Sequence, residues 1–212
     1  MYTALRRQMV QKFVVDIGIT DTRVTEAMLR VPRHLFVDGA LSHQAYSGSS
    51  LPIGFGQTIS HPTTVALMTH TLALTGNEKI LEIGTGSGYQ AAVLAEIGVK
   101  VFTIERIPEL GNRARELYEK LKYYTIAVKI GDGSLGWNEH APYHRIIVTA
   151  SAPHVPDSLI EQLADGGRLV IPVGDSAGQK LTIITRNDNR LKIQEEDWRD
   201  FVPLIGRKGW SV

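Results

Sequence analysis

The hydrophobic positions in the second half of the chain predict strands and helices in alternation. After Gly76, short apolar runs alternate with longer segments in which apolar residues recur every three or four positions. Short runs are typical of buried strands, and the longer spacing is typical of amphipathic helices. We therefore expect strands at 79–83, 100–104, 126–130, 145–149 and 168–173, and helices at 88–97, 107–122 and 156–164. This alternation predicts an α/β fold with a doubly wound, mostly parallel, Rossmann-like sheet.

The N-terminal quarter carries a different pattern. Apolar residues on one helical face from Val24 to Leu35 predict a helix, which Pro32 should break. The Gly, Pro and Ser content of 45–57 predicts an irregular loop leading to a helix that begins near Pro62.

At the other end of the chain we expect Gly166-Gly167 to end the 156–164 helix. The apolar runs at 181–184 and 191–193 are close enough in the chain to pair as antiparallel strands. They would extend the parallel sheet.

Three glycines follow the first expected strand, in the segment Ile80-Leu81-Glu82-Ile83-Gly84-Thr85-Gly86-Ser87-Gly88-Tyr89. Glycine lets a backbone turn tightly and approach a ligand without a Cβ collision. The free N–H groups of the next helix face the same ligand. Glu105 ends the following strand 21 positions after Gly84, near the ~20-residue spacing of a carboxylate that holds a ribose. These features indicate an adenosine-bearing cofactor.

The glycine pattern also selects among such cofactors. A dinucleotide fingerprint needs a third glycine at position 89, where this chain has Tyr89, and Glu82 would repel a pyrophosphate. We predict S-adenosylmethionine instead, with Glu82 facing its ammonium group through water and Glu105 accepting from both ribose hydroxyls. The loop residues expected to bind it are Gly84, Thr85, Gly86 and Gly88. The alternative is a plain turn beside a charge at the end of a strand.

A further carboxylate, Asp132, follows the third strand in Gly131-Asp132-Gly133. Asp-Gly is a common turn pair, but ligands of such sheets gather at the carboxyl ends of the strands. Because Glu82, Glu105 and Thr149 stand at equivalent ends, we expect Asp132 and Gly133 to meet the adenine.

Composition narrows the class of protein. The 212 residues, 43% hydrophobic, fit a single domain, with 1–75 as an N-terminal helical and substrate-loop extension and 76–212 as the cofactor-binding core. The net charge is only +1, so we expect no long-range electrostatic attraction of nucleic-acid phosphates and no nucleic-acid partner. The absence of cysteine and of closely spaced histidines argues against a metal site.

No apolar run reaches ~18 residues and no signal segment is evident, so we expect no membrane partner and a cytoplasmic protein. The oligomeric state is left open, and the run 201–205 is expected to cover either a cleft or a partner subunit.

Beyond the glycine loop, several segments carry a resemblance to a known family: Val31-Pro32-Arg33, Leu51 to Ser60, Thr103 to Pro108, Gly131 to Trp137, Arg145 to Ala152 and Phe201 to Leu204. The run Gln57-Thr58-Ile59-Ser60 before a proline-started helix is the most specific of them. With these segments the chain resembles the protein-L-isoaspartate (D-aspartate) O-methyltransferase family of class I methyltransferases.

The resemblance implies methyl esterification of the α-carboxylate of isoaspartyl residues in damaged proteins, with S-adenosylhomocysteine as the second product. It implies that Ser60 is the active-site serine and that Ile53, Gln57, Thr58 and Ile59 lie on the substrate side. The residues alone favour an N-cap at Ser60, because a serine before His-Pro can accept from a helix amide, and the two roles can coexist. The chain departs from the family pattern at Gly48, His61, His144 and Asp200.

An isoaspartyl carboxylate is already ionised at neutral pH and needs no general base. We expect Ser60 to orient it, between apolar walls supplied by Leu51, Ile53, Phe55 and Ile59. Three alternatives stay open: a methyltransferase for another small acid or amine, a nonenzymatic adenosine-binding or peptide-binding module, and, more distantly, a nicotinamide oxidoreductase.

Overall fold

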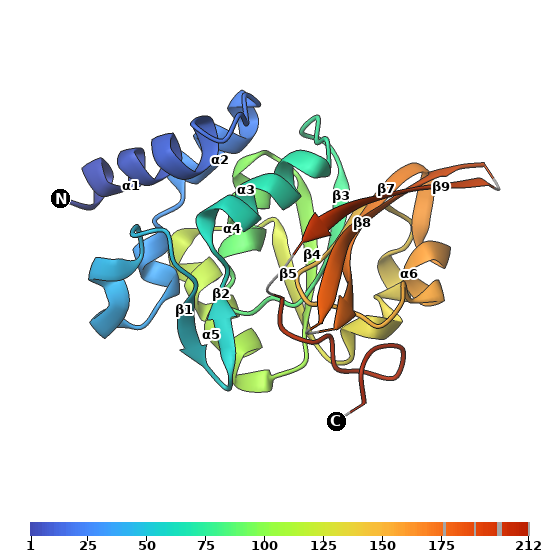
Figure 1. Ribbon diagram of the computed structural model, residues 1–212. Coiled ribbons are helices and arrows are strands. Elements are labelled where there is room, and N and C mark those ends of the chain that lie inside the picture. Colours follow the sequence, from blue (N-terminus) through green and yellow to red (C-terminus); the bar gives the residue numbers. More distant parts are fainter. Residues whose placement is uncertain (176, 189, 199–200, 212) are drawn as a thin grey trace.

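A seven-stranded sheet forms the centre of the computed structural model, which describes residues 1–175, 177–188, 190–198 and 201–211 (Figure 1). The strand order is β5-β4-β3-β6-β7-β8-β9. Pairing is parallel from β5 to β7 and antiparallel between β7, β8 and β9. The strands are β3 (Lys79–Ile83), β4 (Lys100–Glu105), β5 (Ile126–Ile130), β6 (Tyr143–Val148), β7 (Leu163–Asp175), β8 (Gly178–Asn187) and β9 (Arg190–Trp198). The predicted α/β fold, with antiparallel strands at its C-terminal edge, is confirmed.

The order of the strands creates a switch point beside β3. The chain runs outward from β3 through β4 to β5 and then returns to the other side of β3 as β6. The connections therefore diverge at the carboxyl ends of β3 and β6, where open α/β sheets bind ligands.

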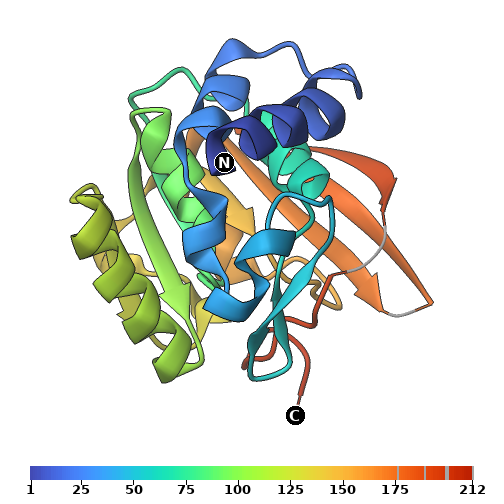
Figure 2. The same cartoon turned by 90° about the vertical axis from the view of Figure 1, so that its left-hand side faces the viewer.

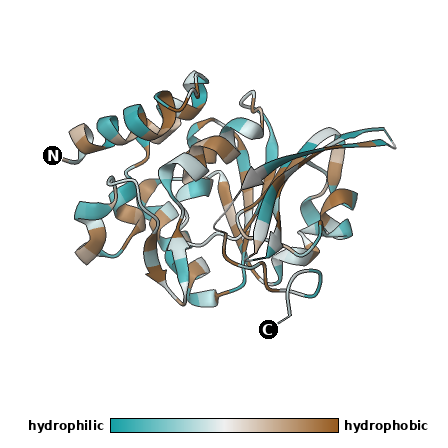
Figure 3. Cartoon of the chain, in the orientation of Figure 1, coloured by the Kyte–Doolittle hydropathy of each residue, from teal (hydrophilic) through white to brown (hydrophobic). Residues whose placement is uncertain are grey.

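Helices cover both faces of the sheet (Figure 2). Strand side chains alternate in direction, so Ile80 and Ile147 pack in one hydrophobic cluster, with residues of the larger helices, while Leu81 and Ile146 pack in another, with Leu159 of α6. The hydropathy colours of Figure 3 show these central strands as largely apolar. The helices after the N-terminal region are α3 (Pro62–Thr71), α4 (Tyr89–Glu96), α5 (Pro108–Leu121) and α6 (Asp157–Glu161), with 3-10 turns at Gly133–Leu135 and Asn138–His140.

The N-terminal region begins with α1 (Tyr2–Val10), which continues as a π-helical stretch at Gln11–Val15. Helix α2 (Thr22–Arg30) is capped by Asp21 and ends just before Pro32, as that proline predicts. Two 3-10 turns, Arg33–Phe36 and Gly39–Gln44, follow. Residues of this region share one hydrophobic cluster with β3, β4 and β6, and the single domain expected for 1–212 stays a prediction.

The prediction of an irregular loop at 45–57 is wrong for the second half of that segment. β1 (Leu51–Gly54) and β2 (Gln57–Ile59) form an antiparallel hairpin there. Gly54 and Gly56, with φ of +95° and +69°, make the tight turn. The glycine content that predicts an irregular loop is therefore concentrated at the tip of a hairpin.

The predicted end of the helix at 156–164 is also wrong. Helix α6 stops at Glu161, and Gly166-Gly167 lies within β7. Leu163 already pairs with β6, and the register shifts before Arg168 resumes the pairing. A Cβ on Gly167 would lie 2.6 Å from the Ala164 carbonyl oxygen, so the glycines accommodate an irregularity in a strand rather than a helix end.

Glu78 stabilises the turn that leads into β3 through hydrogen bonds to its backbone. One carboxylate oxygen accepts from the Thr75 amide and hydroxyl, at 2.7 and 2.6 Å, and the other accepts from the amides of Gly76 and Asn77. Desolvation alone would raise the pKa of Glu78, but these hydrogen bonds outweigh it and lower the pKa to about 2.

We expect Glu78→Gln to destabilise the fold in a pH-dependent way. A depressed folded-state pKa stabilises the protein at pH values above the ordinary pKa of 4.5, and this contribution disappears as the pH falls toward 2. Urea unfolding should therefore show a stability gap between the parent and the variant that is full at pH 7 and narrows below pH 4.5. A gap that does not change with pH would contradict this assignment.

Candidate functional site

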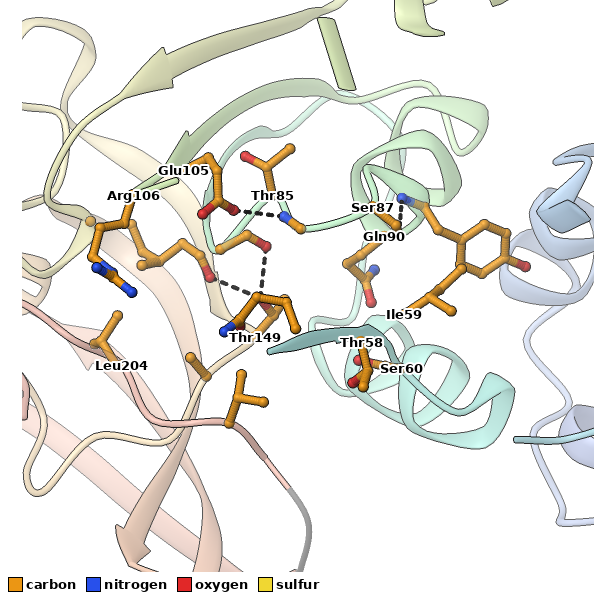
Figure 4. A pocket seen from close by; sticks show the side chains of 18 of the residues that line it. Thr58, Ile59, Ser60, Thr85, Ser87, Gln90, Glu105, Arg106, Thr149 and Leu204 are labelled. Atoms are coloured by element: carbon orange, nitrogen blue, oxygen red, sulfur yellow. Dashed lines mark hydrogen bonds between the residues drawn. The ribbon is translucent and has the colours of Figure 1, made fainter. Parts of the chain in front are cut away.

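A cleft opens at the carboxyl ends of β3, β4 and β6, where the strand order reverses (Figure 4). Its volume, open mouth included, is about 870 Å³. Three segments that are far apart in the chain line it: the β2 segment 57–60, the glycine loop 84–87 and the C-terminal segment 202–205. The remaining lining residues are Thr64, Val65, Met68, Ile83, Tyr89, Gln90, Ile104, Glu105, Arg106, Gly133, Thr149 and Ala150.

The glycine loop is held by the strands on either side. The Gly84 amide donates to the Ile104 carbonyl at 2.9 Å, and the Thr149 hydroxyl donates to the Gly84 carbonyl at 2.7 Å. Gly84 has a φ of +95°, and a Cβ there would lie 2.4 Å from the Thr149 hydroxyl oxygen. Only glycine fits this turn, as its place in the sequence predicts.

Glu105 organises the same loop from the end of β4. One carboxylate oxygen accepts from the Gly86 amide at 2.8 Å, and the other accepts from the Ile107 amide at 2.9 Å. A carboxylate oxygen has a second lone pair, and Glu105 lines the cleft. Both oxygens therefore retain capacity to accept from a ligand.

Glu82 lies beneath the loop and is fully buried. One oxygen accepts from the Thr103 hydroxyl at 2.5 Å, whereas the other, Oε1, has no hydrogen-bond partner among the described residues. Burial, opposed by the Thr103 hydrogen bond and helped by the neighbouring charge of Glu105, raises the pKa of Glu82 to about 8. A buried acceptor without a partner is costly, and a cationic donor close to Oε1 would relieve that cost.

Three of the predicted cofactor residues, Glu82, Gly88 and Asp132, do not line the cleft. Gly88 is the N-cap residue of α4 with a φ of +88°, and its carbonyl accepts from the Tyr118 hydroxyl, so this glycine serves the turn and the helix packing. The Asp132 carboxylate is engaged by other groups of the protein. Its oxygens accept from the Ser134 amide and hydroxyl and, at 2.8 Å, from the Arg207 amide. Asp132 thus caps a 3-10 turn and anchors the C-terminal loop, while Gly133 lines the cleft.

Ser60 faces the cleft and is not an N-cap. The cap of α3 is His61, whose Nδ1 accepts from the Thr63 amide at 3.1 Å. Among the described residues no hydrogen bond involves the Ser60 hydroxyl, whereas the Ser60 carbonyl accepts from Arg33 at 2.7 Å. The capping alternative for Ser60 is therefore wrong, and its hydroxyl is available to a ligand.

The predicted substrate residues divide between the two faces of the hairpin. Gln57, Thr58 and Ile59 line the cleft with Ser60, as expected, but Ile53 lines a separate cavity beside α5. Leu51 lines neither cavity, and Phe55 is 55% exposed at the hairpin tip. Of the four expected apolar walls, Ile59 lines the cleft, and the other apolar lining comes from different elements: Val65, Met68, Ile83, Ile104, Val202 and Leu204.

The C-terminal segment covers the cleft. Ser151 holds it in place, because its amide donates to the Val202 carbonyl at 2.7 Å and its carbonyl accepts from the Leu204 amide at 2.8 Å. The Trp210 indole donates to the same carbonyl. Of the two open expectations for residues 201–205, the structure therefore supports a cover over the cleft. The apolar run is the only signal for this in the sequence.

Three of the departures from the family pattern have a local structural role. A Cβ on Gly48 would lie 2.0 Å from the Phe13 ring, and His61 packs edge-on against the same ring. His144 accepts from the Lys79 amide at the opposite, amino end of the sheet. Asp200 lies outside the described residues.

No described helix is long and apolar enough to span a membrane. No group of three or more His, Cys, Asp or Glu residues among those described is placed to hold a metal ion.

Comparisons with known proteins agree with this geometry. A family model described as Protein-L-isoaspartate(D-aspartate) O-methyltransferase matches residues 5–209. Protein-L-isoaspartate O-methyltransferase 2 of Geotalea uraniireducens is 56% identical over 207 residues, which cover 97% of this chain and 95% of that protein.

Two solved structures are similar over nearly the whole chain. One protein-L-isoaspartate O-methyltransferase superposes with a TM-score of 0.88 at 27% identity, covering 96% of this chain and 67% of that one. A second, from Plasmodium falciparum and described as a putative enzyme of this type in complex with S-adenosyl-L-homocysteine, gives a TM-score of 0.84 at 25% identity. The match covers 94% of this chain and 98% of the other.

Proposed function

The chain belongs to the protein-L-isoaspartate(D-aspartate) O-methyltransferase family, and from this premise we propose the residues of its cleft that carry out the reaction. The protein is an S-adenosylmethionine-dependent methyltransferase that esterifies isoaspartyl residues of damaged proteins, the first step of their repair. Ser60 orients the acceptor carboxylate, while Glu82, Glu105 and the loop 84–86 hold the methyl donor. One observation carries this assignment: the Ser60 hydroxyl, which has no hydrogen-bond partner among the described residues, lines the same cleft as the glycine loop.

The donor side of the cleft has the chemistry that S-adenosylmethionine requires. Both Glu105 oxygens can accept from ribose hydroxyls, and the orphaned Glu82 oxygen suits the ammonium group. Gly133 admits the flat base. When bound, the cofactor supplies an electrophilic methyl group on a sulfonium.

The acceptor side needs positioning rather than proton transfer. A carboxylate with a pKa of about 3 to 4 is anionic at neutral pH. Its oxygen forms the new bond to the methyl carbon as the carbon–sulfur bond breaks, so no proton has to move. Ser60 donates a hydrogen bond that fixes the carboxylate, and alignment of this kind is worth up to ~7–11 kcal/mol. Met68, Ile83 and Leu204 exclude water, which favours a step that joins an anion to a cation.

Transfer of a labelled methyl group tests the acceptor class. The protein is incubated with methyl-tritiated cofactor and equal amounts of an isoaspartyl peptide and its normal aspartyl counterpart. We expect base-labile label, released as methanol, on the isoaspartyl peptide alone. Equal labelling, or base-stable label on an added small acid or amine, would favour the alternative methyltransferase, and no label at all would favour a binding module.

Cofactor binding should release close to one proton at pH 7. The pKa of Glu82, raised to about 8, keeps its carboxyl protonated in the unliganded protein, and a nearby ammonium would lower that pKa and expel the proton. Affinity should therefore increase as the pH rises toward 8. Calorimetry with S-adenosylhomocysteine in buffers of different ionisation enthalpy measures the release, which Glu82→Gln should abolish. Identical enthalpies in all buffers would place the ammonium elsewhere.

Other predictions rest on the sequence alone. The net charge of +1 supports the absence of a nucleic-acid partner. The cytoplasmic location stays a prediction, and the acceptance of D-aspartyl residues is left open.

A further inference from the structure

Arg33 is a completely buried cation behind the acceptor side of the cleft. Its guanidinium donates to the Ala45 carbonyl at 2.8 Å, the Ser60 carbonyl at 2.7 Å and, more weakly, the Ser49 carbonyl at 3.4 Å. It also lies over the Tyr89 ring, 4.8 Å from the centroid. Arg33 therefore connects directly to Ser60 and to an aromatic ring that lines the cleft.

This charge has no counter-ion within the described structure. The ion pairs between described side chains do not include Arg33, and its Nη1 has no hydrogen-bond partner there. Burial lowers the pKa of Arg33 to about 10, with Tyr89 and Tyr46 opposing the shift, so the group is still cationic at neutral pH. Removing a charge from water without a partner is costly. A neutral side chain with N–H groups could donate to the same carbonyls. The hydrogen bonds therefore do not explain why a charged residue stands at position 33.

We propose that Arg33 is a positioning residue for the acceptor: it fixes the Ser60 backbone and leaves this wall of the cleft electropositive, so that the isoaspartyl carboxylate supplies the missing negative charge. This inference rests on the proposed function. A charge in a region of low dielectric acts over several ångströms, so Arg33 does not need to touch the substrate. The donor side, which must accept a cationic group, has Glu105 on a different wall of the cleft and Glu82 buried beneath the glycine loop.

Arg145 provides a matched control. It too is an arginine that clamps backbone carbonyls, donating to Leu72 at 2.7 Å and to Ala73 at 3.2 Å. It stands near the start of β6, whereas the cleft lies at the carboxyl ends of the strands. A purely structural arginine should behave like Arg145.

The experiment compares Arg33→Met, Arg33→Lys and Arg145→Met. For each, kcat and KM for an isoaspartyl peptide, Kd for S-adenosylhomocysteine and the melting temperature are measured. We expect Arg33→Met to lower kcat/KM about five- to tenfold, mainly by raising KM, with Kd within about twofold. Arg33→Lys, which keeps the charge, should recover most of the loss in KM. Arg145→Met should lower the melting temperature and leave both kinetic constants within about twofold.

Several outcomes would overturn the proposal. One is a loss of thermal stability alone in Arg33→Met, as expected for Arg145→Met, and another is a joint rise of KM and Kd. Equal KM values for Arg33→Lys and Arg33→Met would show that the charge has no role. If Arg33→Met does not fold, Arg33→Gln replaces it, since it retains donors without the charge. An inactive parent protein would reject the proposed function instead, so the two failures are distinguishable.

Discussion

Replacing Glu105 with alanine is expected to weaken S-adenosylhomocysteine binding roughly 10- to 150-fold, since hydrogen bonds to a charged group contribute about 1.5–3 kcal/mol. The proposed ribose contacts account for part of this loss. The structure adds a second cause, because the same carboxylate accepts from the amides of Gly86 and Ile107 and so shapes the cofactor loop. Truncation would leave both amides without their acceptor.

Titration calorimetry measures this effect. Glu105→Gln should fall between the parent and the alanine variant, because an amide retains one acceptor oxygen but turns N–H groups toward a backbone donor. Glu109→Ala, at an exposed position in the first turn of α5, should bind like the parent. A change below about threefold in Glu105→Ala would mean that the ribose is held by other residues.

The second large effect is expected on catalysis. Ser60→Ala should lower kcat for an isoaspartyl peptide at least about tenfold, a barrier increase of about 1.4 kcal/mol, while Kd for S-adenosylhomocysteine stays unchanged. The variant loses the hydroxyl that fixes the carboxylate and nothing else of the cleft. Initial rates at saturating cofactor measure kcat, and equal values in the variant and the parent would remove Ser60 from catalysis.

His61→Ala separates the catalytic role from a structural one. Because His61 caps α3, its replacement should cost about 0.5–2 kcal/mol of stability. Ser60→Ala should leave the free energy of unfolding unchanged, since no hydrogen bond of the Ser60 hydroxyl exists among the described residues to be lost. A stability loss in Ser60→Ala as large as that in His61→Ala would mean that the serine supports the fold.

The donor side of the site was accessible to prediction because its parts are close in the sequence. A strand, a glycine turn and a helix start occupy one continuous segment, 80–89, and Glu105 ends the adjacent strand. Their mutual placement follows from strand pairing, which aligns Glu82 with Thr103 and Ile83 with Ile104. Local backbone preference and the parallel pairing of β3 with β4 were sufficient to predict that these residues lie together.

Other parts of the site depend on contacts between distant segments. Arg33 reaches Ser60 across 27 positions, and Asp132 reaches Arg207 across 75. Asp132 does not line the cleft, because a strand-end position does not specify which way a carboxylate turns, and its contact with adenine stays a prediction. The C-terminal loop offers it amide donors that no local pattern reveals.

The amino-acid sequence by itself determined the alternating α/β fold, the glycine turn and the carboxylates below it, since hydrophobic periodicity and glycine's freedom at positive φ act over a few residues. Only the tertiary structure decided that His61 rather than Ser60 caps α3, that residues 202–205 cover the cleft, and that Arg33 is buried with no counter-ion among the described side chains. These outcomes depend on which remote groups compete for the same hydrogen bonds, and that competition exists only once the chain has folded.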